Sequence, residues 1–84
     1  MTKIRKIKQI PIKKVIDHLN LKINSQNKVH CPAHEDRTPS LQIYEKTNSF
    51  YCFSCSTGGS VIDLVRLVRN YSIAKAIQEL EGLL

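Results

Sequence analysis

Three features that are common in small proteins are missing or scarce in this chain of 84 residues. The cysteines number three, so a framework of disulfides would leave one thiol unpaired. No stretch approaches the roughly 20 apolar residues that span a membrane. Acidic residues are scarce in the first thirty positions, which hold only Asp17. The sequence therefore argues against a secreted protein held by disulfides and against a membrane protein.

The start of the chain carries no sign of export. The segment MTKIRKIKQI is charged throughout, and no apolar run follows it. We therefore expect no secretory leader and a cytoplasmic protein whose thiols stay reduced. A chain of 84 residues makes one domain at most, and so small a core is marginal on its own. A bound metal or a partner is expected to supply the missing stability.

Positive charge is concentrated in the N-terminal part of the chain. Residues 1–30 contain eight Lys or Arg and one acid, for a local net charge of +7. Residues 31–84 contain five basic and six acidic residues, for a net charge of −1. Such a basic segment favours a polyanionic partner, and nucleic acid before a membrane.

The spacing of apolar residues predicts three helices. The first begins near Pro11 and ends near Asn20, the second begins at Ser60 with a capping box to Asp63, and Ser72 caps the third. Their apolar faces follow helical periodicity. In order, these faces are Ile12, Val15, Ile16 and Leu19; Val61, Leu64, Val65 and Val68; and Ile73, Ala76, Ile77 and Leu80.

The middle of the chain is predicted to be β structure. Residues 40–45 alternate, with Leu41 and Ile43 on one face and Gln42 and Tyr44 on the other. Residues 48–53 are rich in aromatic side chains, and the trio Lys46-Thr47-Asn48 between the two segments favours a turn. We expect a hairpin here and a short strand at residues 28–30. Residues 1–9 are expected to be a basic tail or a helical extension of a domain at residues 10–84.

Two short pairs of metal-binding residues follow the spacing of a zinc ribbon. Cys31-x-x-His34 and Cys52-x-x-Cys55 stand seventeen residues apart, which suits a hairpin between them. Three thiolates and one imidazole fill the tetrahedral sphere of Zn²⁺, so we expect one structural zinc ion and no catalytic one. His30 is an alternative fourth ligand, although the spacing of His34 mirrors the second pair. Gly58-Gly59 is expected to give the chain a sharp exit after that pair.

The sequence around both pairs resembles a known family. The segments CPAHEDRTPSLQIY and FYCFSCSTGGSVIDLVRLV, with the later SIAKAIQEL, are similar to the N-terminal zinc-binding domain of bacterial and phage DnaG-type DNA primases. The resemblance covers about residues 10–82. It implies zinc on the four residues named above, in a small α+β zinc ribbon with one helix before it and two after it. It also implies contact with a single-stranded template beside a separate RNA polymerase domain, with Arg37 and Phe53 at a basic and an aromatic position of the family.

The sequence carries no catalytic core of a primase. Its seven acidic residues are scattered, and none forms a D-x-D pair suited to two-metal chemistry. We therefore expect no enzyme and no small-molecule substrate, but a part cut from a longer primase or a small free-standing relative. Aromatic rings and cations suit single-stranded nucleic acid, and the candidates near the ribbon are Tyr44, Tyr51, Phe53, Arg37, Lys46 and Lys28.

The leading hypothesis is a zinc ribbon that binds single-stranded DNA in replication and primer synthesis. The alternative is a protein-interaction module that docks on a primase, a replicative polymerase or a helicase, with DNA contact incidental. A regulator that reads duplex DNA is less favoured, since no helix gathers base-reading polar residues on one face.

Overall fold

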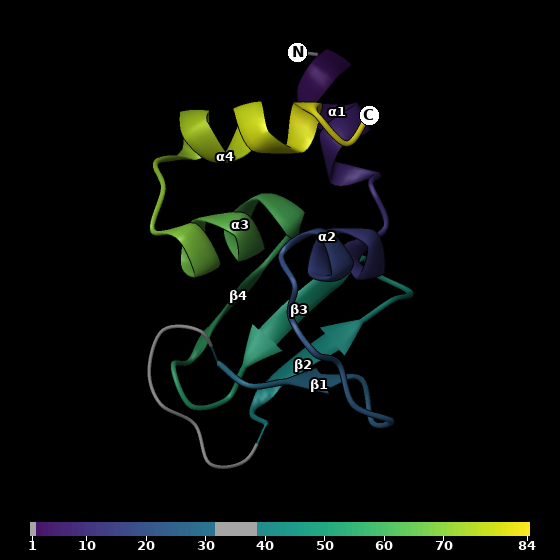
Figure 1. The fold of residues 1–84 in the computed structure, drawn as a ribbon, viewed down its shortest axis with the longest axis vertical. Coiled ribbons are helices and arrows are strands. Elements are labelled where there is room, and N and C mark those ends of the chain that lie inside the picture. Colours follow the sequence, from purple (N-terminus) through teal and green to yellow (C-terminus); the bar gives the residue numbers. More distant parts are fainter. Residues whose placement is uncertain (1, 32–38) are drawn as a thin grey trace.

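The computed structural model describes residues 2–31 and 39–84, with side chains from residue 4 onward. The elements in chain order are α1 (Thr2–Lys8), α2 (Ile12–His18), β1 (Lys28–Val29), β2 (Leu41–Tyr44), β3 (Ser49–Cys52), β4 (Thr57–Gly59), α3 (Val61–Arg69) and α4 (Ile73–Glu81). The four strands form one antiparallel sheet in the order β1-β2-β3-β4. The small α+β fold expected from the sequence is confirmed, with two helices before the sheet where one was expected (Figure 1).

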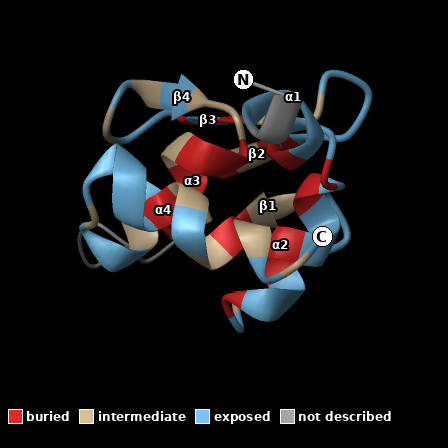
Figure 2. Cartoon of the chain, turned by 90° about the horizontal axis from the view of Figure 1, so that it is seen from above, coloured by how far each residue is buried: buried red, intermediate tan, exposed pale blue. Residues whose placement is uncertain are grey.

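The helices cover one face of the sheet, and among the described residues no helix or strand covers the other face. Alternation along β2 turns Leu41 and Ile43 inward, and the register pairs them with Cys52 and Phe50 of β3. All four are buried and join one core with the apolar faces of the helices. Figure 2 shows these buried sides turned toward the middle of the molecule, with exposed residues around them. The inward and outward faces predicted for residues 40–45 are therefore confirmed.

The basic N-terminal segment forms the helix α1. Ile7 is fully buried, whereas Ile4 is 44% exposed, so one apolar side chain of the segment anchors it to the core. The helix packs against α3 and α4, which come from the far end of the chain. Of the two expectations for residues 1–9, the structure has the helix.

The helices α3 and α4 begin where the sequence predicted, because their caps are local. The backbone N–H of Ser60 donates to the Asp63 carboxylate at 3.0 Å, which is one arm of the predicted capping box. The Ser72 hydroxyl accepts a hydrogen bond from the Lys75 backbone N–H at 3.4 Å at the start of α4. In the last predicted stripe, Ala76 and Leu80 are buried and Ile73 is 55% exposed. Among the described residues, no helix is long and apolar enough to cross a membrane.

The strand β4 corrects the expectation of a sharp exit at Gly58-Gly59. These glycines continue the sheet, with Gly58 paired to Tyr51 and Gly59 to Phe50. A Cβ on Gly58 would lie 2.8 Å from Cδ1 of Tyr51, so the tyrosine ring occupies the space above this glycine. Gly59 has a φ of 151° and lies against the Asp63 carboxylate, which leaves no room for a side chain. Both glycines thus fit β4 between β3 and the start of α3.

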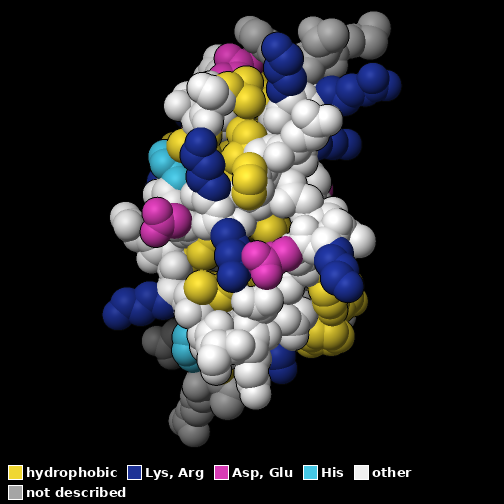
Figure 3. All heavy atoms as spheres, turned by 90° about the vertical axis from the view of Figure 1, so that its right-hand side faces the viewer, with side chains coloured by type: hydrophobic (Ala, Val, Ile, Leu, Met, Phe, Trp, Pro, Cys, Tyr) yellow, Lys and Arg dark blue, Asp and Glu magenta, His cyan; other side chains and the backbone are white. Residues whose placement is uncertain are grey.

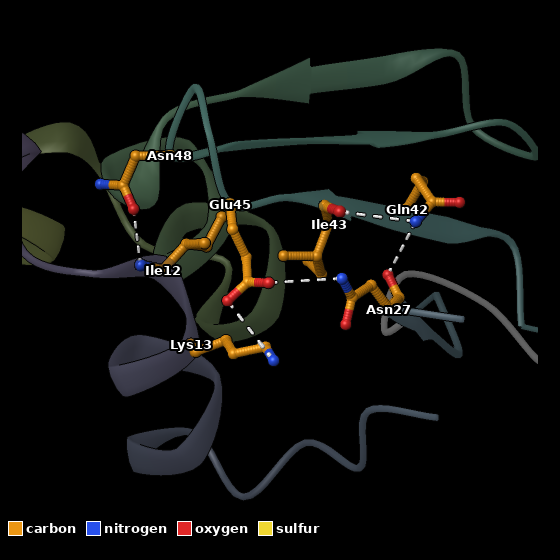
Figure 4. A network of polar contacts seen from close by, with 7 residues as sticks. All are labelled: Ile12, Lys13, Asn27, Gln42, Ile43, Glu45 and Asn48. Carbon is orange, nitrogen blue, oxygen red and sulfur yellow. Dashed lines mark hydrogen bonds and ion pairs between the residues drawn. The ribbon is translucent and has the colours of Figure 1, made fainter. Parts of the chain in front are cut away.

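Asn48 joins the β2–β3 turn to the segment between α1 and α2. Its Oδ1 accepts a hydrogen bond from the Ile12 backbone N–H at 2.7 Å, at the first turn of α2 (Figure 4). Its Nδ2 donates to the backbone carbonyls of Lys8 and Ile10, each at 2.8 Å. A φ of 52° in the left-handed region, which asparagine tolerates better than most residues, aims the side chain there. One amide thereby supports two helix ends.

Candidate metal centre and the open face of the sheet

The topology of the sheet brings the three cysteines together. Strands β1 and β3 both pair antiparallel with β2, so they run in the same direction, and their C-terminal ends lie at the same end of the sheet. Cys31 follows β1, Cys52 ends β3, and Cys55 lies in the turn after β3. Their three sulfur atoms lie within 4.8 Å of one another, and the Sγ atoms of Cys31 and Cys55 are 3.1 Å apart. All three are free thiols.

This cluster has the chemistry and the spacing of a zinc site. Zinc–sulfur bonds of about 2.3 Å in a tetrahedron place sulfur atoms about 3.8 Å apart, a separation that the cluster accommodates. Cys31 and Cys52 are buried and Cys55 is half-buried, so little of the donor set faces water. Thiolate sulfur selects zinc over hard cations such as magnesium and calcium. When bound, the ion cross-links the three segments of the chain that carry these cysteines.

The surroundings of Cys52 favour the thiolate, which is the form that binds metal. Burial raises the pKa of this thiol, but hydrogen bonds outweigh burial and lower the pKa from 9.0 to about 6. The groups that make them are the Ser54 hydroxyl, the Cys55 backbone, the Cys31 thiol and the Ser40 hydroxyl. The two hydroxyls lie 3.6 and 3.7 Å from the Cys52 sulfur and also contact each other. Sequence reasoning missed this role of Ser40 and Ser54; the position of Ser54 between the ligands was the only signal.

The fourth ligand remains a prediction. His34 lies outside the described residues, as does Arg37. His30 is described and exposed, and the metal-binding cluster found in the described part of the chain contains the three cysteines without it. The chain therefore offers His34 as the candidate to complete the donor set.

Exchange of one histidine for asparagine tests this assignment. We expect His34→Asn to lower zinc affinity by at least 10-fold, because one of four ligands is lost. His30→Asn is the matched control and is expected to keep one zinc ion per chain. The measurement is zinc content after dialysis against a graded series of chelator concentrations. The opposite ranking of the two variants would make His30 the ligand.

The open face of the sheet presents aromatic side chains. Tyr44, Tyr51 and Phe53 are 42%, 37% and 62% exposed, whereas Phe50, on the other face of β3, is 2% exposed. The rings of Tyr51 and Phe53 meet edge to face, with centroids 5.1 Å apart and planes at 71°. In the register of the sheet, Lys28, Gln42, Tyr51 and Gly58 form one row across this face. We call the residues Lys28, Gln42, Tyr44, Tyr51 and Phe53 the open face.

Cations lie at the border of the open face. Lys46 is exposed in the β2–β3 turn, where it lines a hollow of about 350 Å³ together with Tyr44 and Asn27. Lys28 is half-buried at its position on β1. Most of the N-terminal cations lie elsewhere, on α1 and α2, which pack on the covered side of the sheet. Figure 3 shows Lys and Arg side chains spread along one side of the molecule from top to bottom.

Several known proteins are similar to this chain in sequence. Residues 1–83 match the family described as CHC2 zinc finger. The chain is 39% identical over 75 residues to a DNA primase of Aquifex aeolicus, covering 87% of this chain and 15% of that protein. It is 31% identical over 72 residues to a DNA primase of Buchnera aphidicola, covering 86% of this chain and 11% of that protein.

The similarity extends to three dimensions. The crystal structure of the Aquifex aeolicus primase, with its zinc-binding and RNA polymerase domains, matches with a TM-score of 0.79 and 35% identity. That match covers 95% of this chain and 21% of the crystallised chain. The 84 residues thus span a small part of the length of these relatives.

Proposed function

The chain belongs to the CHC2 zinc-finger family of DnaG-type DNA primases, and from this membership we propose that it binds single-stranded DNA in primer synthesis. One structural zinc ion on Cys31, His34, Cys52 and Cys55 holds the ends of β1 and β3 together. The open face of the sheet carries the template strand. Catalysis belongs to a separate polymerase domain that acts with this module, and a primase or a helicase is the protein partner.

The observation that carries this proposal is the exposure of three aromatic rings on one face of a small sheet. Between 37% and 62% of the surface is exposed on Tyr44, Tyr51 and Phe53, although burial of each ring would stabilise so small a core. Rings on a sheet are stacking platforms for unpaired bases, and each stacked base is worth about 1–3 kcal/mol. Lys28 and Lys46 stand at the border to meet phosphates, and Arg37 is the third cation proposed for this role.

Replacement of Tyr51 tests the role of the open face. We expect Tyr51→Ala to weaken binding of a short single strand by about 5-fold to 100-fold, because one stacking surface is lost. Tyr51→Phe keeps the ring and is expected to bind like the unchanged chain. Fluorescence anisotropy of a labelled oligothymidylate measures both, and zinc content verifies that each variant is folded.

The salt dependence of binding distinguishes a nucleic-acid module from a protein-interaction module. The logarithm of the association constant is expected to fall linearly with the logarithm of salt concentration, by about 0.7 for each phosphate contacted. Unchanged affinity in Tyr51→Ala together with a flat salt response would contradict the proposal. Loss of binding to a primase polymerase domain or helicase in the same variant would then favour a protein-docking face.

A further inference from the structure

A second hollow, of about 350 Å³, lies at the β4 border of the sheet, where α3 packs beside the strand. Strand β4 supplies Thr57 and Gly58 to its lining. The helix supplies Arg66, and the lining continues with Asn70, the residue that caps the C-terminal end of α3, and with Tyr71 directly after it. We call this the β4–α3 hollow. It lies between elements that are adjacent in Figure 1, on the opposite border of the sheet from Lys28.

One glycine belongs both to the lining of the β4–α3 hollow and to the row of residues across the open face. Gly58 lines the hollow and is also the partner of Tyr51 in the register of the sheet. The Tyr51 ring occupies the space where a side chain at position 58 would stand. A single strand of DNA that stacks on Tyr51 therefore meets no side chain at position 58 on its way to the hollow.

The lining offers groups that bind a nucleotide. Arg66 is exposed, and among residues 2–31 and 39–84 no ion pair or side-chain hydrogen bond engages its guanidinium. A guanidinium binds phosphate through two parallel hydrogen bonds. Asn70 carries both a donor and an acceptor for a base edge. The Tyr71 ring lies 5.3 Å from the Lys75 ammonium, which adds a second cation near the border of the hollow.

The acid in the lining is already engaged. Asp63 Oδ2 accepts hydrogen bonds from the Ser60 backbone N–H at 3.0 Å and from the Ser60 hydroxyl at 3.4 Å. The carboxylate lies in the first turn of α3, where the helix dipole offsets part of its charge. Its repulsion of a phosphate near Arg66 is reduced accordingly.

We propose that the β4–α3 hollow binds one further nucleotide of the single strand that lies on the open face. Arg66 binds the phosphate of this nucleotide, and Asn70 and Tyr71 contact its base. This subsite rests on the proposed function, since it extends the path of a strand already held by Tyr51. It adds length to the binding site, and with Asn70 it adds a group that distinguishes one base from another.

Oligothymidylates of two lengths test the subsite. For an oligothymidylate of about twelve nucleotides, we expect Arg66→Ala to weaken binding about 5-fold to 10-fold. For one of about four nucleotides, too short to cover both places, the same variant is expected to bind within 2-fold of the unchanged chain. Asn70→Gly is a second variant, because glycine accepts the left-handed φ of 58° at this position. It is expected to weaken binding of the longer strand alone, by about 2-fold to 5-fold.

Arg69→Ala is the matched control for charge. It removes one cation from the same helix, and the Arg69 guanidinium is directed to Glu79, at 3.3 Å. This control is expected to change the binding of neither strand by more than 2-fold. Equal effects of Arg66→Ala and Arg69→Ala on the longer strand would overturn the subsite, and so would equal losses by Arg66→Ala on both lengths.

The results also separate this subsite from the proposed function. If Tyr51→Ala weakens the binding of both oligothymidylates and Arg66→Ala weakens neither, the open face is the binding site and the hollow is not part of it. A chain that binds neither strand would remove both. Thymidine monophosphate is a further competitor. If it occupies the hollow with the same affinity as the longer oligothymidylate, the hollow is a site for free nucleotides, and the proposal that it extends the binding site of a DNA strand is contradicted.

Discussion

A chain in which Cys52 is replaced by Ala is expected to be unfolded at 25 °C, and the unchanged chain is expected to unfold when a strong chelator removes its metal. Structural zinc contributes on the order of 10 kcal/mol to the folding of small domains. That amount is comparable to the whole free energy of unfolding of a typical protein, about 5–15 kcal/mol. The cysteine sulfurs come from the end of β1, the end of β3 and the turn after β3, so the ion ties together three segments of the sheet.

Far-ultraviolet circular dichroism and native mass spectrometry, each with and without chelator, measure this effect. The native mass is expected to show one zinc ion per chain, and both the ion and the β signal are expected to disappear together and return when zinc is added. Ser56→Ala is the control, since Ser56 is an exposed residue of the same turn. A metal-free chain that keeps its sheet and its melting temperature would contradict the structural role of zinc.

Asn48→Ala is expected to lower the free energy of unfolding by about 2–4 kcal/mol. The change removes three hydrogen bonds of 2.7–2.8 Å and leaves the Ile12 N–H and two backbone carbonyls without their partner. Each lost bond costs about 1 kcal/mol, and a buried group without a partner costs more. Alanine also tolerates the φ of 52° less well than asparagine does. For a domain of this size, the loss corresponds to a fall of roughly 10–20 °C in Tm, measured by thermal denaturation of the zinc-loaded chain.

Two variants separate the hydrogen bonds of Asn48 from its backbone conformation. Asn20 has a similar φ of 59° and an exposed side chain, so Asn20→Ala measures the backbone cost, about 1 kcal/mol. Asn48→Gly keeps the conformation and loses the hydrogen bonds, and we expect it to lose about 2–3 kcal/mol. If Asn48→Ala costs no more than Asn20→Ala, the bridge to the α1–α2 segment has no effect on stability.

The parts of the fold that were predictable from the sequence are those with local causes. The capping pair Ser60 and Asp63 marks the start of α3, and the alternation of residues 40–45 assigns the two faces of β2. The spacing of the Cys residues predicted which sulfur atoms would lie together, because an antiparallel hairpin returns the chain to the end of the sheet from which it started. Each of these signals lies within a few residues of the element it specifies.

The parts that were missed depend on partners far along the chain. Strand β4 contains two glycines, which have a low strand preference, and it forms because the edge of β3 is available for pairing. The choice between a tail and a helix for residues 1–9 depends on the packing of Ile7 against α3 and α4. For Asn48 the sequence predicts only a turn, because nothing near it in the sequence reveals a bond to Ile12, 36 residues away.

Strand β3 carries three functions on consecutive residues, since Phe50 faces the core, Tyr51 faces outward and Cys52 holds its sulfur in the cluster. A slip of one residue in its pairing would turn the tyrosine inward and expose the thiol. A chain that holds metal on Cys52 has therefore also turned its Tyr51 ring toward the open face. Metal content thus reports the pairing of β3, and the amount of bound zinc in a preparation measures the fraction of molecules whose open face is correctly formed.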